Sequence, residues 1–269
     1  MKSKDAFDDF SIKVPFFVPS ITNKDKMAVM DALNSPLLTD GPKLRQFEKD
    51  FSKFTGVKHS IATTSCTTAL ELSLVALGIN PDDEIILPAF TWIATANVVE
   101  HLKAKVVFCD IDLKTFNIDV DKIRGLITKK TKAIIPVHLF GLSADMAPVM
   151  NIAEKYNLIV VEDAACGFGA LYREKYVGNF GNTGCFSFHP RKAITTGEGG
   201  MVVTNDEKLY KQCLYFKNLC FPLDSPRNYI HEDIGFNYRL SNIHAAIGLA
   251  QVEKADDYKL MRIKNADYY

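Results

Sequence analysis

The sequence predicts an α/β fold with a mostly parallel β-sheet, and two patterns carry this prediction. Short apolar runs rich in β-branched residues recur along the chain, and segments with apolar residues at helical spacing lie between them. Near-continuous apolar runs are typical of parallel strands that are buried on both faces. Because the chain has 269 residues, it is long enough for one large domain or two smaller ones.

The expected strands follow these apolar runs in chain order. A helix over 145–157 joins two of them, which is the kind of connection that parallel neighbours need. Helices are also expected after each of the first two strands, and the last part of the chain, 206–269, has a helical pattern. The seven expected strands span 59–65, 83–89, 105–112, 132–139, 158–164, 184–188 and 199–205.

Composition and charge exclude several kinds of partner. Lys and Arg together number 32, as do Asp and Glu, so the net charge is zero and gives no electrostatic case for nucleic acid or an anionic membrane. No run of about 18 apolar residues predicts a membrane span, and the N-terminus lacks a signal-peptide pattern. The six cysteines form no CxxC pair and no metal-ligand spacing, so we expect no metal site and buried, reduced thiols in a cytoplasmic protein.

A lysine in the stretch FSFHPRKAITTGEGG is the first candidate for chemistry. Lys192 lies between an expected strand and a glycine-rich turn, where backbone can approach a ligand closely. A solvated surface lysine is the simple interpretation, and an amine that forms a Schiff base with a carbonyl cofactor is the functional one. Asp163 ends a buried strand one supersecondary unit earlier, so both side chains can face one crevice. Pyridoxal 5′-phosphate (PLP) requires such a lysine and an acid beside its ring nitrogen; an N-cap would also explain Asp163.

Other residues are suited to the phosphate and the ring of such a cofactor. Ser65, Cys66 and Thr67 lie at a strand-to-helix turn, where free N–H groups and the helix dipole favour an anion, although ordinary N-capping explains the same residues. Ser187, shortly before Lys192, is a further candidate phosphate donor. Trp92, the single tryptophan, follows a strand end, where its ring can either stack on a cofactor or pack in the core.

These stretches, taken in order, resemble the DegT/DnrJ/EryC1/StrS family of PLP-dependent sugar aminotransferases. The resemblance runs from about residue 15 to residue 262 and implies the large domain of fold-type I PLP enzymes, a mostly parallel seven-stranded sheet sandwiched by helices. The similar stretches are LTDGPKLRQFEKDFSKFTG, SCTTALELSLVALG, LPAFTWIATANVV, VFCDID, IIPVHLFGLSADM, VVEDAACGFGA, FSFHPRKAITTGEGGMVVTND and IGFNYRLSNIHAAIGLAQVEK.

The resemblance implies roles for individual residues. Lys192 would hold PLP as an imine and move the proton at the reacting carbon, Asp163 would pair with the ring nitrogen, and Trp92 would stack on the ring. Asn237 is similar to an asparagine that reaches the phosphate of the neighbouring subunit's cofactor, which implies a homodimer with shared active sites. Phosphate contacts are implied for Cys66, Thr67 and Ser187.

The resemblance also implies the reaction. Lysine at position 192 favours transamination, because relatives that remove a sugar hydroxyl have histidine there. The expected reaction moves an amino group from an amino acid, with glutamate as the expected donor, to a nucleotide-linked 4-keto-6-deoxy sugar. The stretch around Lys192 is particularly similar to enzymes that make GDP-perosamine from GDP-4-keto-6-deoxymannose. The alternatives are a dTDP- or UDP-linked sugar, a PLP-binding and dimerising fragment without turnover, and an amino-acid lyase or desulfurase of the same fold type.

Two features depart from the family pattern. Cys166 stands where the family usually has glutamine or histidine contacting the phenolic oxygen of the cofactor, and a thiol is a weaker hydrogen-bond partner. The chain is also shorter than typical members. We expect an N-terminal tail over 1–14, a PLP-binding large domain over 15–250, and over 251–269 the start of a helix leading to a truncated C-terminal small domain.

Overall fold

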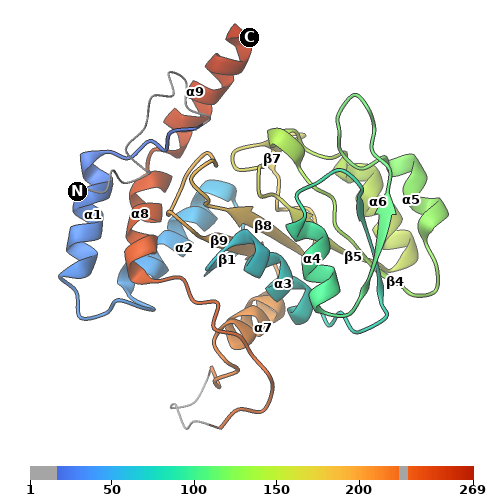
Figure 1. Cartoon of the computed structure of the whole chain (residues 1–269), viewed down its shortest axis with the longest axis horizontal. Coiled ribbons are helices and arrows are strands. Elements are labelled where there is room, and N and C mark those ends of the chain that lie inside the picture. Colours follow the sequence, from blue (N-terminus) through green and yellow to red (C-terminus); the bar gives the residue numbers. More distant parts are fainter. Residues whose placement is uncertain (1–16, 224–229) are drawn as a thin grey trace, which may run out of the picture.

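The computed structural model describes residues 17–223 and 230–269. It is an α/β body in which a twisted sheet lies between helices (Figure 1). The expected N-terminal tail, 1–14, lies outside the described residues. The expected large domain, 15–250, is described from residue 17 onward apart from 224–229.

Seven strands form the central sheet, and one of them runs against the other six. Only β9 is antiparallel to its neighbours, β1 and β8, whereas the remaining pairs are parallel. The predicted mostly parallel seven-stranded sheet is therefore confirmed. The order across the sheet is β1 (His59–Thr63), β9 (Gly200–Thr204), β8 (Thr183–Ser187), β5 (Ile159–Asp163), β4 (Thr131–Ile134), β2 (Glu84–Pro88) and β3 (Lys105–Cys109).

The reversal of β9 follows from the short segment that precedes it. Residues 188–199 contain no helix and fold back on themselves, because the Phe188 N–H donates to the Gly199 carbonyl at 2.9 Å and the Thr196 N–H to the Phe188 carbonyl at 3.1 Å. A parallel arrangement would need a longer crossover connection. The returning segment carries Lys192 at the edge of the sheet where β8 ends.

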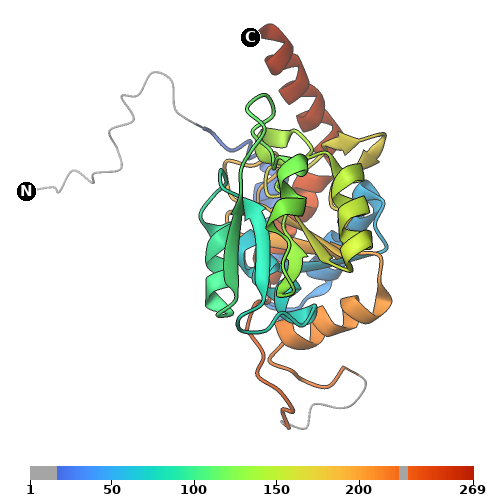
Figure 2. The same ribbon diagram turned by 90° about the vertical axis from the view of Figure 1, so that its right-hand side faces the viewer.

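Helices cover both faces of the sheet. In β2, Ile85 and Leu87 belong to a core shared with α3 (Cys66–Ala76), α4 (Ala94–His101) and α7 (Glu207–Lys217), whereas Ile86 faces α5 (Val120–Leu126) and α6 (Met146–Tyr156). This alternation is what a strand buried on both faces requires. α2 (Pro42–Thr55) and α8 (Asn242–Val252) complete the second layer over β1, β8 and β9 (Figure 2). The predicted sandwich is confirmed.

The remaining elements lie at the periphery. α1 (Asn23–Leu33) packs on α8, a 3-10 helix spans Leu139–Gly141, and β6 (Leu171–Tyr172) and β7 (Lys175–Tyr176) form a small hairpin. The helical pattern predicted over 206–269 is confirmed where α7, α8 and α9 (Ala255–Tyr268) lie, whereas the described residues between α7 and α8 form no helix. α9 projects from the body (Figure 1) and exposes apolar side chains, namely Leu260, Met261 and Ile263.

The predicted strands extend beyond the observed ones, and the largest excess, at the end of the strand predicted over 132–139, has a local reason. The strand predicted over 132–139 ends as β4 at Ile134, although its backbone continues to bond to both neighbours: the Ile135 N–H donates to the Ile86 carbonyl at 2.8 Å and the His138 N–H to the Asp163 carbonyl at 3.0 Å. Pro136 lies between them and has no N–H, so the regular ladder stops there.

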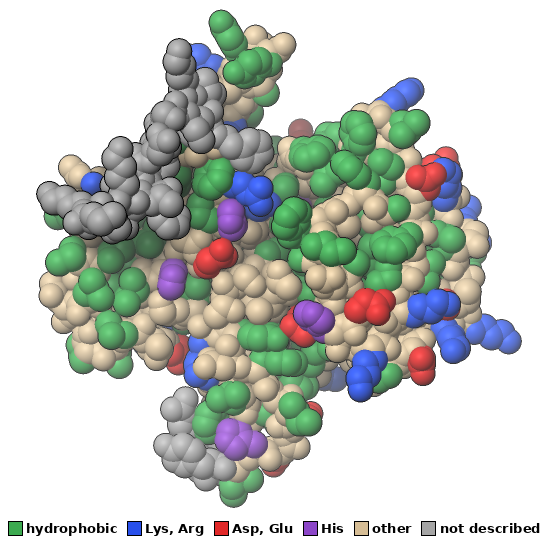
Figure 3. Space-filling view, in the orientation of Figure 1, with side chains coloured by type: hydrophobic (Ala, Val, Ile, Leu, Met, Phe, Trp, Pro, Cys, Tyr) green, Lys and Arg blue, Asp and Glu red, His purple; other side chains and the backbone are tan. Residues whose placement is uncertain are grey.

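The surface shows no field of a single sign on the face drawn in Figure 3, where basic and acidic side chains alternate with apolar ones. Within residues 17–223 and 230–269, no helix is both long enough and apolar enough to cross a bilayer.

Candidate active site

Most of the sequence-predicted residues gather where β5 and β8 end and α3 begins. Lys192 is half-buried, and its Nζ donates to the Cys166 Sγ at 3.1 Å. The Lys192 backbone N–H donates to the His189 carbonyl at 2.8 Å, which closes the turn that carries the amine. The interpretation of Lys192 as a freely solvated surface lysine does not describe this environment, because the amine points to a thiol at the edge of the sheet.

Asp163, the last residue of β5, is buried with 4% of its surface exposed. Its Oδ2 accepts a hydrogen bond from the Thr95 hydroxyl at 2.8 Å, and its Oδ1 accepts one from the Ala165 backbone N–H at 3.1 Å. Burial raises the pKa of this carboxyl group, whereas both hydrogen bonds favour the anion and oppose that rise. A buried carboxylate with spare lone pairs is suited to a cationic partner such as a ring N–H.

Electrostatic interactions show that these groups share one environment. Burial raises the pKa of the Cys66 thiol well above its usual value, and the charge of Asp163 raises it further, whereas Lys192 lowers it. Cys166 also acts on Cys66, and Lys192 acts on Asp163. Four residues from three separate stretches of the sequence therefore lie within electrostatic range of one another.

The N-terminus of α3 supplies donors suited to an anion. The N-capping interpretation of Ser65 is confirmed, since its Oγ accepts from the Thr68 backbone N–H at 3.1 Å. Within the described part of the chain, the backbone N–H groups of Cys66 and Thr67 have no acceptor. Such free N–H groups at the positive end of a helix dipole are where phosphates bind.

Gly200 brings β9 unusually close to this helix terminus. A Cβ at Gly200 would lie 2.3 Å from the Ser65 carbonyl oxygen and 2.6 Å from the Cys66 backbone nitrogen. Across the sheet, Gly200 pairs with Ser187, the last residue of β8. Ser187 is 9% exposed, and its Oγ is 3.4 Å from the His189 backbone N–H. The start of α3 therefore packs directly on Gly200, the cross-strand partner of Ser187, and only a residue without a side chain permits this contact.

Trp92 lies beside the lysine-bearing segment. Its side chain is 68% exposed, so the core-packing interpretation is wrong. The guanidinium of Arg191 lies over the indole, 5.8 Å from the ring centroid. An exposed aromatic face next to Lys192 is free to stack on a flat ligand, and the sequence argument missed Arg191 as its neighbour.

The sequence argument missed one residue of this site and selected another that lies apart from it. The missed residue is Thr95, whose hydroxyl bonds to Asp163. Its only signal in the sequence was a hydroxyl at the start of a helix that follows a strand end. Asn237 is exposed, and its backbone forms an isolated bridge with Asn218. Asn237 is not brought to the Lys192 group within this chain, so its role at a neighbouring subunit's cofactor stays a prediction.

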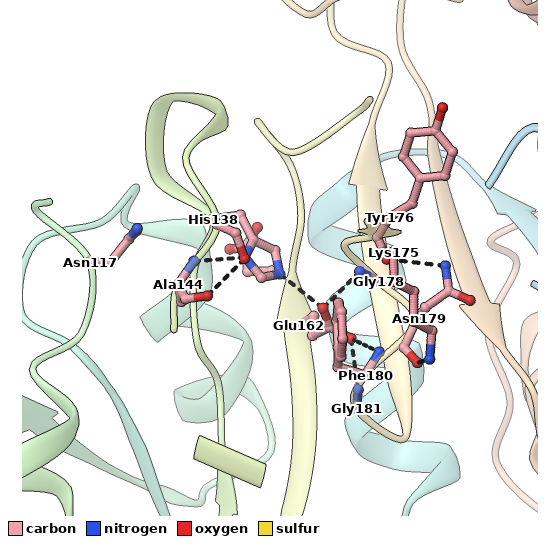
Figure 4. Close-up of polar contacts among 12 residues, drawn as sticks. Asn117, His138, Ala144, Glu162, Lys175, Tyr176, Gly178, Asn179, Phe180 and Gly181 are labelled. Atoms are coloured by element: carbon pink, nitrogen blue, oxygen red, sulfur yellow. Dashed lines mark hydrogen bonds and ion pairs between the residues drawn. The ribbon is translucent and has the colours of Figure 1, made fainter. Parts of the chain in front are cut away.

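A buried polar network joins the ends of β4 and β5 to the turn at residues 178–181 (Figure 4). Glu162 and His138 are both fully buried, with 3.0 Å between the histidine Nε2 and the Glu162 Oε2. The His138 Nδ1 accepts the Ala144 N–H, which leaves Nε2 as the ring nitrogen that donates to Glu162. The other acceptor sites of Glu162 are filled by the backbone N–H groups of Gly178, Phe180 and Gly181. The interpretation of His138 as structural agrees with this arrangement.

The donor set fits PLP and does not suggest a metal. An amine, a buried carboxylate, an exposed indole and unpaired helix N–H groups match an aldehyde, a ring nitrogen, a ring face and a phosphate respectively. Among the described residues, no group of three or more His, Cys, Asp or Glu side chains is placed to hold a metal ion.

A mostly parallel sheet with a lysine, a buried acid and unpaired helix N–H groups at its strand ends is the arrangement of a PLP-dependent transferase. A family model agrees: residues 19–269 match the DegT/DnrJ/EryC1/StrS aminotransferase family. The chain belongs to that family. Its aminotransferases use PLP, and related structures are known in the PLP form and with the amine form, PMP, bound.

Individual relatives are similar over most of this chain. A GDP-perosamine synthase of Escherichia coli O157:H7 is 44% identical over 257 residues, which cover 95% of this chain and 70% of the synthase. PseC of Helicobacter pylori, an aminotransferase involved in pseudoaminic acid biosynthesis, matches with a TM-score of 0.84 and 36% identity over 88% of this chain and 64% of PseC. A GDP-4-keto-6-deoxymannose-3-dehydratase variant with bound GDP-perosamine matches with a TM-score of 0.90 and 29% identity, over 94% of this chain and 71% of that one. The chain thus spans about two thirds of the length of these relatives.

Proposed function

We propose that this protein transfers the amino group of an amino acid, with L-glutamate as the expected donor, to the ketone of GDP-4-keto-6-deoxymannose and so forms GDP-perosamine. The observation that carries the proposal is the placement of Lys192, Asp163, Trp92 and the start of α3 at the carboxyl ends of the parallel strands. The 44% identity to a GDP-perosamine synthase supports the choice of sugar. A dTDP- or UDP-linked keto-sugar is the alternative substrate.

Each residue has a distinct task in this proposal. When bound, PLP supplies the carbonyl that takes up the donor's nitrogen and the electron sink that makes its exchange with a ketone possible. The Lys192 amine holds the cofactor and moves a proton to and from the carbon that loses or gains nitrogen. Asp163 presents a negative charge to the ring nitrogen, and its burial strengthens that interaction.

The remaining predicted residues bind and orient. The N–H groups of Cys66 and Thr67 bind the phosphate at the start of α3. Ser187, the cross-strand partner of Gly200, is the further phosphate donor. Trp92 stacks on the ring face. Cys166, whose Sγ lies 3.1 Å from the lysine amine, would contact the phenolic oxygen of the cofactor.

The proposal also covers the oligomeric state, the use of the product and the cellular compartment. Asn237 acts at the partner's cofactor in a homodimer with shared active sites. The product would enter a cell-surface polysaccharide such as O-antigen. Free thiols at all six cysteines are what a cytoplasmic protein would have.

The first experiment is to purify the chain with PLP, record its visible absorbance, and add glutamate and then GDP-4-keto-6-deoxymannose. We expect a yellow protein with a borohydride-stable adduct on Lys192, loss of colour with glutamate, and recovery of colour with formation of an amino sugar detected by mass spectrometry. Lys192→Ala is the control and should give neither adduct nor product. A yellow protein that ignores glutamate would indicate a PLP-binding fragment without turnover, and cleavage of a free amino acid would indicate a lyase.

A further inference from the structure

Thr95 connects two residues that the proposed cofactor site uses. It lies in the first turn of α4 and is fully buried. Its hydroxyl donates to the Asp163 Oδ2 at 2.8 Å, and its backbone N–H donates to the Trp92 carbonyl at 3.1 Å. A second hydroxyl, that of Thr91, lies 3.0 Å from the Thr95 Oγ1 and completes its hydrogen bonding. One residue therefore bonds to β5 through its side chain and to the Trp92 turn through its backbone.

We propose that Thr95 is a positioning residue that holds the carboxylate of Asp163 and the turn of Trp92 in fixed relation before the cofactor binds. The inference rests on the PLP site of the proposed function but not on the identity of the sugar. The pyridine ring of PLP must meet Asp163 at its nitrogen and Trp92 on its face at the same time. Holding both groups in place beforehand reduces the ordering that binding would otherwise require.

The carboxylate needs this donor because of its surroundings. Burial disfavours the charged form of Asp163, and the hydrogen bonds from Thr95 and the Ala165 N–H are what oppose that effect most strongly. The charged form is the one that pairs with a protonated ring nitrogen. The other titratable groups that act on Asp163 or feel its charge are Lys192, His138, Cys66 and Cys185.

The hydrogen bonds to Asp163 also leave part of the acceptor capacity of its carboxylate unused. Each carboxylate oxygen receives one hydrogen bond from the protein, that from Thr95 on Oδ2 and that from the Ala165 N–H on Oδ1. A carboxylate can accept about four hydrogen bonds, so acceptor capacity remains for a ring N–H. Thr95 thus restricts rotation of the carboxylate without using up its capacity.

Substitution at Thr95 separates the side-chain bond from the backbone bond. Thr95→Val keeps the shape and the N–H to Trp92 but loses the hydroxyl, and Thr95→Ser keeps the hydroxyl. Trp92 is the only tryptophan and is exposed, so quenching of its fluorescence reports PLP binding directly. We expect Thr95→Val to bind PLP about tenfold more weakly, as for a lost hydrogen bond to a charged group, and Thr95→Ser to bind within a fewfold of the parent.

Visible circular dichroism of the bound cofactor gives a second readout, because it reports how the ring is held. We expect its signal to change in Thr95→Val and to be restored in Thr95→Ser. A matched control is Thr204→Val, since Thr204 is equally buried at the far end of β9 and its hydroxyl donates to the Asn182 carbonyl at 2.8 Å. The control should lose thermal stability but keep the fluorescence and dichroism titrations of the parent.

A double-mutant cycle with Asp163→Asn decides whether Thr95 acts through Asp163. Loss of the hydroxyl should weaken PLP binding in the parent but have little further effect when Asp163→Asn has removed the charge. The inference would be overturned if Thr95→Val weakened PLP binding equally in the parent and in Asp163→Asn. It would also be overturned if Thr95→Val left the PLP affinity and the circular dichroism of the bound cofactor unchanged. These results are independent of the sugar: a parent that binds PLP but does not aminate GDP-4-keto-6-deoxymannose would refute the proposed reaction and leave the Thr95 result standing.

Discussion

Lys192 and Cys166 place an amine 3.1 Å from a thiol at the mouth of the site. Cys166 is exposed, whereas the other five cysteines are buried. Burial raises the pKa of Cys66 and Cys185 well above the usual value and that of Cys109 to about 11. Because the thiolate is the reactive form, chemistry at cysteine should concentrate on Cys166.

Alkylation should therefore mark the site. We expect iodoacetamide at neutral pH to modify Cys166 before any other cysteine, and we expect prior loading with PLP to slow that modification. Peptide mass mapping at short reaction times measures both effects, with Cys166→Ser as the control. Equal labelling of a buried cysteine, or labelling that PLP does not affect, would contradict this placement of Cys166.

Asp163 gives a prediction about pH. Because burial raises its pKa in the folded state above that in the unfolded chain, the folded protein binds the proton more tightly, so stability is lost as pH rises through the folded-state pKa. Asp163→Asn removes this titration. We expect the melting temperature of the PLP-free Asn variant, relative to the parent, to rise between pH 4 and pH 7. Thermal melts at several pH values measure the trend, and a constant difference would contradict a raised pKa.

At the scale of elements, the Glu162 network fixes the ends of β4 and β5 to the turn that enters β8. The Glu162 Oε1 accepts from the Phe180 and Gly181 N–H groups at 2.7 Å, and Oε2 accepts from the Gly178 N–H and from His138 (Figure 4). Each oxygen serves two donors, so neither can be replaced by an amide NH₂ group without placing donors against one another.

Glu162→Gln should consequently destabilise the fold. We expect a loss of about 2–4 kcal/mol in the free energy of unfolding, because buried N–H groups lose their acceptor. Urea denaturation followed by circular dichroism measures it, and Glu100→Gln, at an exposed position on α4, is the control with no expected loss. Equal midpoints for the two variants would show that the network contributes nothing to stability.

The contact between β9 and α3 is the second feature at this scale. Gly200→Ala would force the start of α3 away, since the new Cβ meets backbone atoms at 2.3–2.6 Å that no side-chain rotation can relieve. We expect about 1–3 kcal/mol of destabilisation and weaker PLP binding by fluorescence titration. Gly125→Ala, on α5 with open space at its Cβ, should be neutral or slightly stabilising. PLP binding by Gly200→Ala at parental affinity would argue against a phosphate at the start of α3.

At the scale of the whole molecule, several apolar side chains remain at the surface. Met27, Met30 and Leu33 of α1 are exposed, as are Phe90 and Phe140 near the carboxyl ends of the strands. Phe90 and Phe140 lie side by side, with 6.5 Å between their ring centroids, and exposed apolar side chains that group together often mark an interface. This agrees with the proposal that two chains share their active sites.

Complementation tests the shared sites. Lys192→Ala and Asn237→Ala should each be inactive in the amino-transfer assay. If Asn237 acts on the partner's cofactor, a mixed dimer of the two variants contains one site with both residues intact. We therefore expect the mixture to recover partial activity after subunit exchange, with light scattering to confirm a dimer. No recovery from a dimer that exchanges subunits would place Asn237 outside the partner's site.

The sequence by itself determined the fold class, and it selected Lys192 and Asp163 as candidates, because strand periodicity and the position of a residue at a strand end are local properties. It did not identify Thr95 or Arg191, and it left the environment of Trp92 open. The contacts of these three residues depend on which strands become neighbours and on how closely the helices approach the strands. Only the tertiary structure decided that a thiol faces the lysine and that Thr95 bonds to Asp163, because both contacts join segments brought together by packing.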